Sequence, residues 1–342
     1  MKTKAIYPFT AIVGQEEMKT ALLLSIVMPA LGGVLIKGEK GTAKSTAVRA
    51  VAALLPDLRA VQGCACHCDP SVPELYCDAC CRRAEEGAIT AEEMPMRVVE
   101  LPVSATEDRV VGTLDMEAAI QHGRKEFEPG ILAAANRNIL YVDEINLLED
   151  HIVDILLDSA AMGVNTVERE GISYAHPARF VLVGTMNPEE GDIRPQLLDR
   201  FALSVTVAGE AAPETRIEVI RRRIAYERDP DAFAAAYAGE QEKLRAQIIE
   251  ARDRIASVEV PDAALDLAAQ VSLTLGVDGH RADITLVKAG IAHAALMGRT
   301  TVTAEDLQRV SRLVLAHRLR RRPFEEGAAD WSAVDAILGG SA

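Results

Sequence analysis

Short apolar runs alternate with amphipathic stretches over roughly the first 208 residues of the chain. The runs lie at residues 34–36, 98–101, 139–142, 180–183 and 204–207. The runs at 34–36, 139–142 and 180–183 are apolar throughout, which is typical of strands buried on both faces of a parallel sheet. Helical patterns separate them, at residues 16–28, about 44–55 and 151–162. This alternation predicts a three-layer α/β/α domain with a parallel central sheet.

The strand-like runs stop after about residue 208, and residues 213–342 show only helical patterns. One late helix has a clear start, because Thr303 suits its N-cap and Asp306 its third helical position. The sequence therefore predicts a larger α/β domain over residues 1–208 and a smaller all-α domain over residues 209–342.

Two segments interrupt the pattern of the larger domain. Residues from about 61 to 95 are rich in cysteine, proline and acidic residues, which indicates an insertion. Residues from about 163 to 180 alternate around Glu170 and Gly171, which predicts an inserted β-hairpin.

Acidic residues outnumber basic ones, with 51 Asp and Glu against 37 Lys and Arg and a net charge of -14. Such a chain repels a phosphate backbone unless basic residues gather locally, so nucleic acid is not the expected partner. No stretch approaches the ~20 apolar residues of a membrane span. The first residues also lack the apolar core of a signal peptide. We therefore expect a cytoplasmic protein that does not cross a membrane.

A glycine-rich loop lies between the first predicted strand and the helix that follows it. Its sequence at residues 38–45, Gly-Glu-Lys-Gly-Thr-Ala-Lys-Ser, is that of a P-loop, whose N–H groups hold phosphates at a helix N-terminus. Lys44 is expected to neutralise the β- and γ-phosphates of ATP, and Ser45 to hold Mg²⁺. Ala43 replaces the usual glycine, and its Cβ would crowd the backbone if φ is positive there. The predicted nucleotide-binding residues of the loop are Gly38, Gly41, Thr42, Ala43, Lys44, Ser45 and Thr46.

Polar residues follow two further strands. Asp143 and Glu144 end the strand at 139–142, at the edge where parallel sheets bind their ligands. Asp143 is expected in the Mg²⁺ shell, and Glu144 as the base that orients and deprotonates the attacking water. Asn187 follows the next run, where its amide would bond the γ-phosphate or that water. The alternatives are an acidic turn at the first position and a turn cap before Pro188 at the second.

Three arginines are candidates for contact with ATP. Arg200 is predicted to act on the ATP of a neighbouring subunit, because a planar, permanently charged guanidinium stabilises developing phosphoryl charge. Arg194 is the second candidate for that role. Arg281 opens a helix of the smaller domain, from which it would reach the nucleotide. The alternatives are a surface ion pair with Asp199 for Arg200, and an ordinary surface position for Arg281.

Several sequence segments are more specific for one protein family than the P-loop is. They are Glu-Asp-Arg-Val-Val-Gly-Thr-Leu-Asp at 107–115, Phe-Glu-Pro-Gly-Ile-Leu at 127–132, residues 139–148, and residues 184–201. Together they resemble the ATPase subunit I family of magnesium chelatase, in the helix-2-insert clade of AAA+ ATPases. The resemblance covers most of residues 5–330 and implies an AAA+ domain followed by a helical lid domain. MoxR ATPases and MCM helicases are relatives that also carry Ala-Lys in this loop, so Ala43 is compatible with ATP binding.

The resemblance implies a motor function. In that family the ATPase subunit forms a hexameric ring, which docks on a subunit that carries a metal-binding integrin-like domain. Together they drive a large porphyrin-binding subunit, and ATP hydrolysis powers Mg²⁺ insertion into protoporphyrin IX. The predicted hairpin would be one of the clade's inserts, facing the ring or the partner.

Three alternatives stay open at this point. A cobaltochelatase ATPase subunit is built in a similar way, and a MoxR-like chaperone would load metal into other enzymes. A nucleic-acid motor of the MCM type shares inserts in the same fold. The residues themselves predict only an ATP-hydrolysing ring, and chelation is what the resemblance adds.

Thiols gather within the first insertion. Six cysteines and one histidine fall within 18 residues: Cys64, Cys66, His67, Cys68, Cys77, Cys80 and Cys81. Thiols this dense predict a tetrahedral, structural Zn²⁺ site. Cys77 and Cys80 have the spacing of one ligand pair. Two of Cys64, Cys66 and Cys68 would complete the set. An iron–sulfur cluster, redox-active thiols and unligated cysteines are the alternatives.

A dense basic run, His-Arg-Leu-Arg-Arg-Arg, occupies residues 317–322, and a smaller one lies at 221–223. Such runs are also found on nucleic-acid-binding faces. Because Glu325 and Glu326 follow and the whole chain is acidic, we expect a solvated helix end or a subunit contact here.

Overall fold

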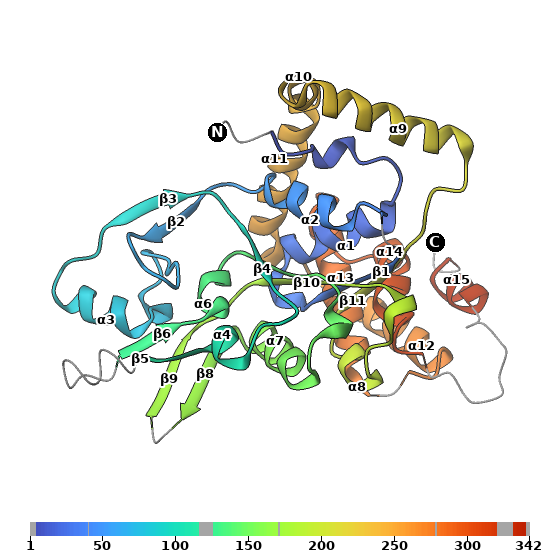
Figure 1. The fold of residues 1–342 in the computed structure, drawn as a ribbon. Coiled ribbons are helices and arrows are strands. Elements are labelled where there is room, and N and C mark those ends of the chain that lie inside the picture. The colour runs from blue at the N-terminus through green and yellow to red at the C-terminus, as the bar shows by residue number, and fades with distance from the viewer. Residues whose placement is uncertain are drawn as a thin grey trace. The chain divides into compact units, whose positions relative to one another are not determined.

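Two compact units make up the chain (Figure 1). The computed structural model describes residues 5–39, 41–115, 126–169, 172–277, 279–319 and 331–339. The first unit combines Met1–Lys37 with Arg194–Ala342, and the second unit is Gly38–Ile193. The second unit is therefore one continuous central segment, and the first is built from the two ends of the chain.

A parallel sheet forms the centre of the second unit. Its strands are β4 (Val98–Leu101), β7 (Ile139–Val142) and β10 (Val181–Met186), with β7 in the middle. Every residue of β7 and β10 is buried, which explains why their sequences are apolar throughout. Val142 pairs with Leu101 on one side and Gly184 on the other. The residues that follow β7 and β10 therefore lie at the same edge of the sheet.

Helices connect these strands. The helices α2 (Lys44–Ala52) and α7 (Asp150–Met162) lie close to predicted positions. The short helices α4 (Glu107–Val111) and α6 (Ile131–Ala135) were not predicted. α2 ends earlier than expected, because the N–H groups of Leu54 and Leu55 bond carbonyls three residues back, both at 3.2 Å. This tighter pattern is common where a helix ends, and here it comes before Pro56. α7 ends at Gly163, whose φ of 71° suits a left-handed C-cap.

Two-stranded antiparallel ribbons also belong to this unit, and three occur among its described residues (Figure 1). They are β2 (Leu58–Val61) with β3 (Ala91–Met94), β5 (Gly112–Asp115) with β6 (Glu126–Pro129), and β8 (Val164–Arg169) with β9 (Ile172–Pro177). The third ribbon is the predicted hairpin, whose expected tip at Glu170 and Gly171 lies outside the described residues. The first encloses η3 (Pro73–Leu75) and α3 (Asp78–Glu85), so the cysteine-rich insertion has elements of its own. The second ribbon was not predicted.

The first unit holds the neighbouring strands β1 (Val34–Gly38) and β11 (Leu203–Val207). Helix α1 (Glu16–Val27) contacts β11 and buries Leu22, Leu24 and Ile26. The short helix α8 (Pro195–Leu198) precedes β11. The remaining 3₁₀ helices of the described chain are η1 (Phe9–Ala11), η2 (Pro29–Leu31), η4 (Ile145–Leu147), η5 (Pro188–Glu190) and η6 (Ile255–Ser257).

Beyond β11 the described chain is helical, apart from one bridge between Glu259 and Thr301. The helices are α9 (Pro213–Arg228), α10 (Pro230–Ala236), α11 (Ala238–Arg254), α12 (Asp262–Thr274), α13 (His280–Leu296), α14 (Ala304–Leu315) and α15 (Trp331–Gly339). α14 begins with the predicted cap, since Thr303 Oγ1 accepts the Asp306 N–H and the Asp306 carboxylate accepts the Thr303 N–H. The helical character of this region is confirmed, and the domain division at residues 208 and 209 stays a prediction.

Candidate nucleotide-binding site

The P-loop residues connect β1 to α2 as the sequence predicts. Ala43 occupies the N-cap of α2 and cannot cap the helix with its side chain, which leaves the first N–H groups suited to an anion. Lys44 donates from Nζ to the carbonyl oxygens of Gly38 and Glu39, the latter at 3.0 Å. Thr42 Oγ1 donates to the same Glu39 oxygen at 2.8 Å. The loop therefore closes on itself with an ammonium group beside a helix N-terminus, an arrangement that fits a nucleotide phosphate.

Ala43 has the strained backbone that its Cβ makes costly. Its φ is 60° and ψ 18°, in the left-handed region, whereas Gly41 has a φ of 87° that glycine adopts freely. A non-glycine residue in this region costs about 1–2 kcal/mol. The chain adopts this conformation at Ala43 in spite of that cost.

At the end of β7, one hydroxyl of β10 positions both predicted acids. Thr185 Oγ1 donates to Asp143 Oδ1 at 2.5 Å and accepts the Glu144 N–H at 3.2 Å. Tyr141 donates its hydroxyl to the same Asp143 oxygen at 2.8 Å. Burial, and then the hydrogen bond to Asp143, raises the pKa of Tyr141, so the phenol remains a donor at neutral pH. Asp143 itself is exposed and Glu144 half-buried, which leaves this edge accessible to a ligand.

The roles of Thr185 and Tyr141 were not predicted from the sequence. Tyr141 belongs to an apolar run and Thr185 closely follows one, so their hydroxyl groups look like incidental members of a buried strand. Only the register between the two strands reveals the role of Thr185. If Gly184 pairs with Val142, then Thr185 must lie beside Asp143.

Asn187 caps the turn that follows β10. Its side chain is 6% exposed, and its Oδ1 accepts the Glu189 N–H at 3.2 Å, at the start of η5. The cap that was the alternative reading is therefore present. It uses the amide oxygen, whereas contact with a phosphate would use the amide nitrogen, so that role stays a prediction.

The predicted arginines all belong to the first unit, and one of them, Arg281, contacts Asp199. Arg281, in the first turn of α13, donates to Asp199 Oδ2 at 3.1 Å, and Arg318 donates to Asp199 Oδ1 at 3.3 Å. Arg200, the residue after Asp199 in the sequence, is half-buried, and Arg194 is exposed at the N-cap of α8. Arg281 is thus held by an ion pair in which both side chains are about half exposed.

Arg318 is buried, so the expectation of a solvated helix end or subunit contact at residues 317–322 is wrong for this residue. Its guanidinium donates to the carbonyl oxygens of Val314 at 2.7 Å, Phe201 at 2.8 Å, Asp199 at 3.2 Å and Ala202 at 3.4 Å. Burial lowers its pKa to about 10, which leaves it charged at neutral pH. Arg318 therefore fixes the turn that carries Arg200. Residues 320–322 of the basic run lie outside the described residues.

In the cysteine-rich insertion, four sulfur atoms come together. Sγ atoms of Cys64, Cys68, Cys77 and Cys80 all lie within 4.8 Å of one another, and all four residues are buried. Cys66 is buried in the same cluster but falls outside this set, and Cys81 is exposed. Hydrogen bonds from the neighbouring thiols, Cys66 first, hold the pKa of the Cys64 thiol well below its usual value.

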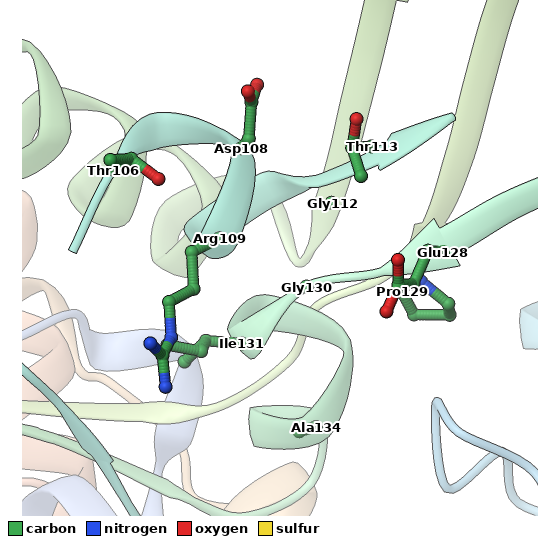
Figure 2. Close-up of a pocket in the computed structure, with 10 residues that line it drawn as sticks. All are labelled: Thr106, Asp108, Arg109, Gly112, Thr113, Glu128, Pro129, Gly130, Ile131 and Ala134. Carbon is green, nitrogen blue, oxygen red and sulfur yellow. The ribbon is translucent and has the colours of Figure 1, made fainter. Parts of the chain in front are cut away.

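A separate pocket of about 490 Å³ lies between the α4–β5 and β6–α6 segments (Figure 2). Asp108, Arg109 and Glu128 bring charges of both signs to its lining, so it has no marked preference for an anion. The two segments approach closely, and a Cβ on Gly130 would lie 2.4 Å from the Val110 carbonyl oxygen. None of the predicted nucleotide-binding residues lines this pocket.

Three features together are typical of the AAA+ class of P-loop proteins. They are a P-loop at a helix N-terminus, acids and an amide at the ends of adjoining parallel strands, and a helical region that follows in the sequence. Residues 265–337 match the family described as AAA lid domain. Residues 113–196 match the family described as magnesium chelatase, subunit ChlI.

Whole-chain relatives identify the family. The chain is 55% identical over 320 residues to a magnesium-chelatase subunit ChlI homolog of Methanocaldococcus jannaschii, covering 94% of this chain and 87% of that protein. It is 54% identical over 325 residues to the magnesium-chelatase 38 kDa subunit of Acidiphilium rubrum, covering 95% and 94%. The chain therefore belongs to the magnesium chelatase subunit ChlI family, as its sequence strings predicted.

A solved structure supports the same assignment. A complex between subunits BchI and BchD of magnesium chelatase, based on a cryo-EM reconstruction, contains a chain with 53% identity and a TM-score of 0.57. The match covers 93% of this chain and 98% of that one. The predicted AAA+ fold with a helical lid is confirmed. None of the described helices is long and apolar enough to span a membrane.

Proposed function

We propose that this chain is the ATP-hydrolysing motor subunit of a magnesium chelatase, and that it couples hydrolysis to Mg²⁺ insertion into protoporphyrin IX by a partner subunit. The observation that carries the proposal is the Asp143–Thr185 contact at 2.5 Å. It orients the predicted metal-binding acid at the ligand edge of the sheet, in a chain whose relatives are chelatase subunits.

Mg²⁺ and the ATP phosphates would bind where the P-loop meets this edge. In the proposal, Lys44 neutralises the β- and γ-phosphates, while Ser45 and Asp143 hold Mg²⁺. Glu144 then orients the attacking water and accepts its proton, and Asn187 donates from its amide nitrogen to the γ-phosphate or the water. The other phosphate contacts would come from Gly38, Gly41, Thr42, Ala43 and Thr46.

A complete site would need a neighbouring copy. We assign Arg200 to the ATP of the adjacent subunit in a ring, by the family resemblance a hexamer, with Arg194 as the alternative arginine. Arg281 would contact the nucleotide from the helical lid, here taken as residues 209–342, by exchanging its Asp199 partner for a phosphate. Arg318 keeps the Arg200 turn in place through its contacts with main-chain carbonyls.

The proposed partners follow from the same resemblance. The solved relative is described in complex with BchD, and we propose an equivalent second subunit with an integrin-like domain for this chain. A large porphyrin-binding subunit would carry out the insertion, and the complex would work in the cytoplasm. The inserted Mg²⁺ is substrate and is distinct from the Mg²⁺ bound with ATP.

Reconstitution tests the proposal. This protein, ATP and Mg²⁺ are added to the porphyrin-binding and integrin-like chelatase subunits, and Mg-porphyrin fluorescence is followed over time. We expect an ATP-dependent signal that disappears with Glu144→Gln. A silent assay in which ATP is still hydrolysed would refute magnesium chelation with those partners, and would favour a cobaltochelatase subunit or a MoxR-like metal-loading chaperone.

A further inference from the structure

Four cysteines of the insertion have the geometry of a closed metal site. Tetrahedral Zn²⁺ with Zn–S bonds near 2.3 Å places its sulfur ligands roughly 3.8 Å apart. The Sγ atoms of Cys64 and Cys77 are 3.8 Å apart, and the whole set lies within 4.8 Å. A disulfide would need a separation of about 2.05 Å, so these thiols are not paired as disulfides.

The local fold brings the two pairs of sulfurs together. Cys64 and Cys68 flank a tight turn, in which the His67 N–H bonds the Cys64 carbonyl at 3.1 Å and His67 has a φ of 47°. Cys77 and Cys80 lie at the start of α3, where the helix N-terminus favours thiolates. The Cys77 N–H also donates to Cys68 Sγ at 3.2 Å, a contact that stabilises a thiolate.

The insertion has a small apolar core. Its buried cluster consists of five cysteines with Val61 and Ala133, and only Tyr76 and Ile89 pack on it as partly buried apolar residues. A segment of this size with so few aliphatic side chains gains too little stability from apolar burial to fold without an additional cross-link. Metal–thiolate bonds are the cross-link that this set of residues can form.

We propose that Cys64, Cys68, Cys77 and Cys80 bind one structural Zn²⁺ ion that folds the insertion. The spacings, three residues between the first pair and two between the second, match those of zinc sites. Four thiolates select soft and borderline ions, and the absence of an open ligand position suits a structural rather than a catalytic ion. Of the three cysteines that the sequence left open, the geometry selects Cys64 and Cys68 and leaves out Cys66.

Zinc would fix the insertion to the beginning of β7. Arg137, just before that strand, donates to the carbonyl of His67 at 3.2 Å and forms an ion pair with Asp69 at 2.7 Å. Asn136 donates to the Cys66 carbonyl at 2.6 Å. These contacts hold the loop of the first cysteine pair against the strand whose other end carries Asp143. The ion is therefore separate from the proposed nucleotide chemistry and acts on stability.

Metal analysis of the full-length protein tests this site without any activity assay. We expect one zinc per chain in protein purified without chelators, and loss of that zinc in Cys68→Ser and Cys77→Ser. Cys66→Ala and Cys81→Ser are the matched controls, and both should keep it. After exchange with Co²⁺, the wild type should show the visible absorption of a tetrahedral tetrathiolate site.

Several outcomes would overturn the proposal. The wild-type protein could contain no zinc, or it could contain iron and show the absorption of an iron–sulfur cluster. Zinc could also be kept by both Ser variants or lost from either control variant. If the Ser variants fail to fold, titration of the wild type with a mercurial decides the question. Release of one zinc as four thiols react supports the site, and thiol reaction without zinc release refutes it.

Discussion

The polar groups at the two ends of β7 differ in their exposure to solvent. At the carboxyl end, Asp143 is exposed although Tyr141 and Thr185 both bond to it. At the amino end, Asn136 and Asn138 are 2% and 1% exposed and bind the cysteine-rich insertion. An edge that must admit a ligand keeps its charge accessible, whereas a structural site can satisfy every polar group within the protein.

This contrast predicts that changes at the carboxyl end alter the rate of reaction, and that changes at the amino end alter stability. The largest effect is expected for Glu144→Gln, because it removes a proposed base while keeping the side chain's shape. ATP hydrolysis should fall about 10²–10⁴-fold. Steady-state phosphate release at saturating ATP measures it, with Glu149→Gln on the exposed N-cap of α7 as the control. A fall of less than about tenfold would exclude Glu144 as the base.

Asn138→Leu tests the amino end. Its side chain accepts the Arg97 N–H at 2.8 Å and donates to the Asn136 carbonyl at 3.1 Å, and both groups would lose a partner. Orphaned buried polar groups cost about 1–3 kcal/mol each, so we expect about 2–6 kcal/mol of lost stability in urea unfolding. The rate of ATP hydrolysis by the folded protein should stay unchanged. If the rate of ATP hydrolysis fell together with stability, the two ends of β7 would not have the separate roles proposed for them.

Thr185→Val should produce a smaller effect on the rate. The methyl group keeps the shape but removes the donor to Asp143 and the acceptor of the Glu144 N–H. A hydrogen bond to a charged group is worth about 1.5–3 kcal/mol, so kcat should fall about 10- to 100-fold. Thr185→Ser keeps the hydroxyl and serves as the matched control. Equal losses in the two variants would mean that packing, rather than the hydrogen bond, matters here.

Ala43→Gly should change least. Glycine relieves the left-handed strain of about 1 kcal/mol, but it also gains about as much entropy in the unfolded chain. The net change in stability should stay within about 0.5 kcal/mol, with the KM for ATP unaltered, whereas Ala47→Gly inside α2 should cost about 1 kcal/mol. A large gain in ATP affinity for Ala43→Gly would show instead that the Cβ hinders nucleotide binding.

Local patterns predicted much of the fold. The buried strands, the start of α14 at Thr303 and the hairpin at 163–180 follow from residues close together in sequence. Capping and periodicity are local effects, which is why they can be read without tertiary information. The β5–β6 ribbon was not predicted, because its two short strands show no clear alternation of polar and apolar residues over enough positions.

The site was only partly predictable for the same reason. The P-loop and Asp143 follow from motifs, but the role of Thr185 depends on the register between β10 and β7. The burial of Arg318 depends on tertiary contact with a turn more than 100 positions earlier in the sequence. A basic run looks solvated until the structure supplies carbonyl acceptors for one of its members.

Those contacts of Arg318 limit how the chain can be shortened. Its guanidinium bonds the backbone of Asp199 and Phe201, so a fragment that ends before residue 318 would leave these carbonyls without their charged donor. The helical region after β11 therefore cannot be removed without affecting the rest of the first unit. Expression of residues 1–208 alone would give a chain in which the turn that carries Arg200 is poorly fixed. A shorter residue at position 318 would also remove the hydrogen bond that Arg318 donates to the Asp199 carboxylate.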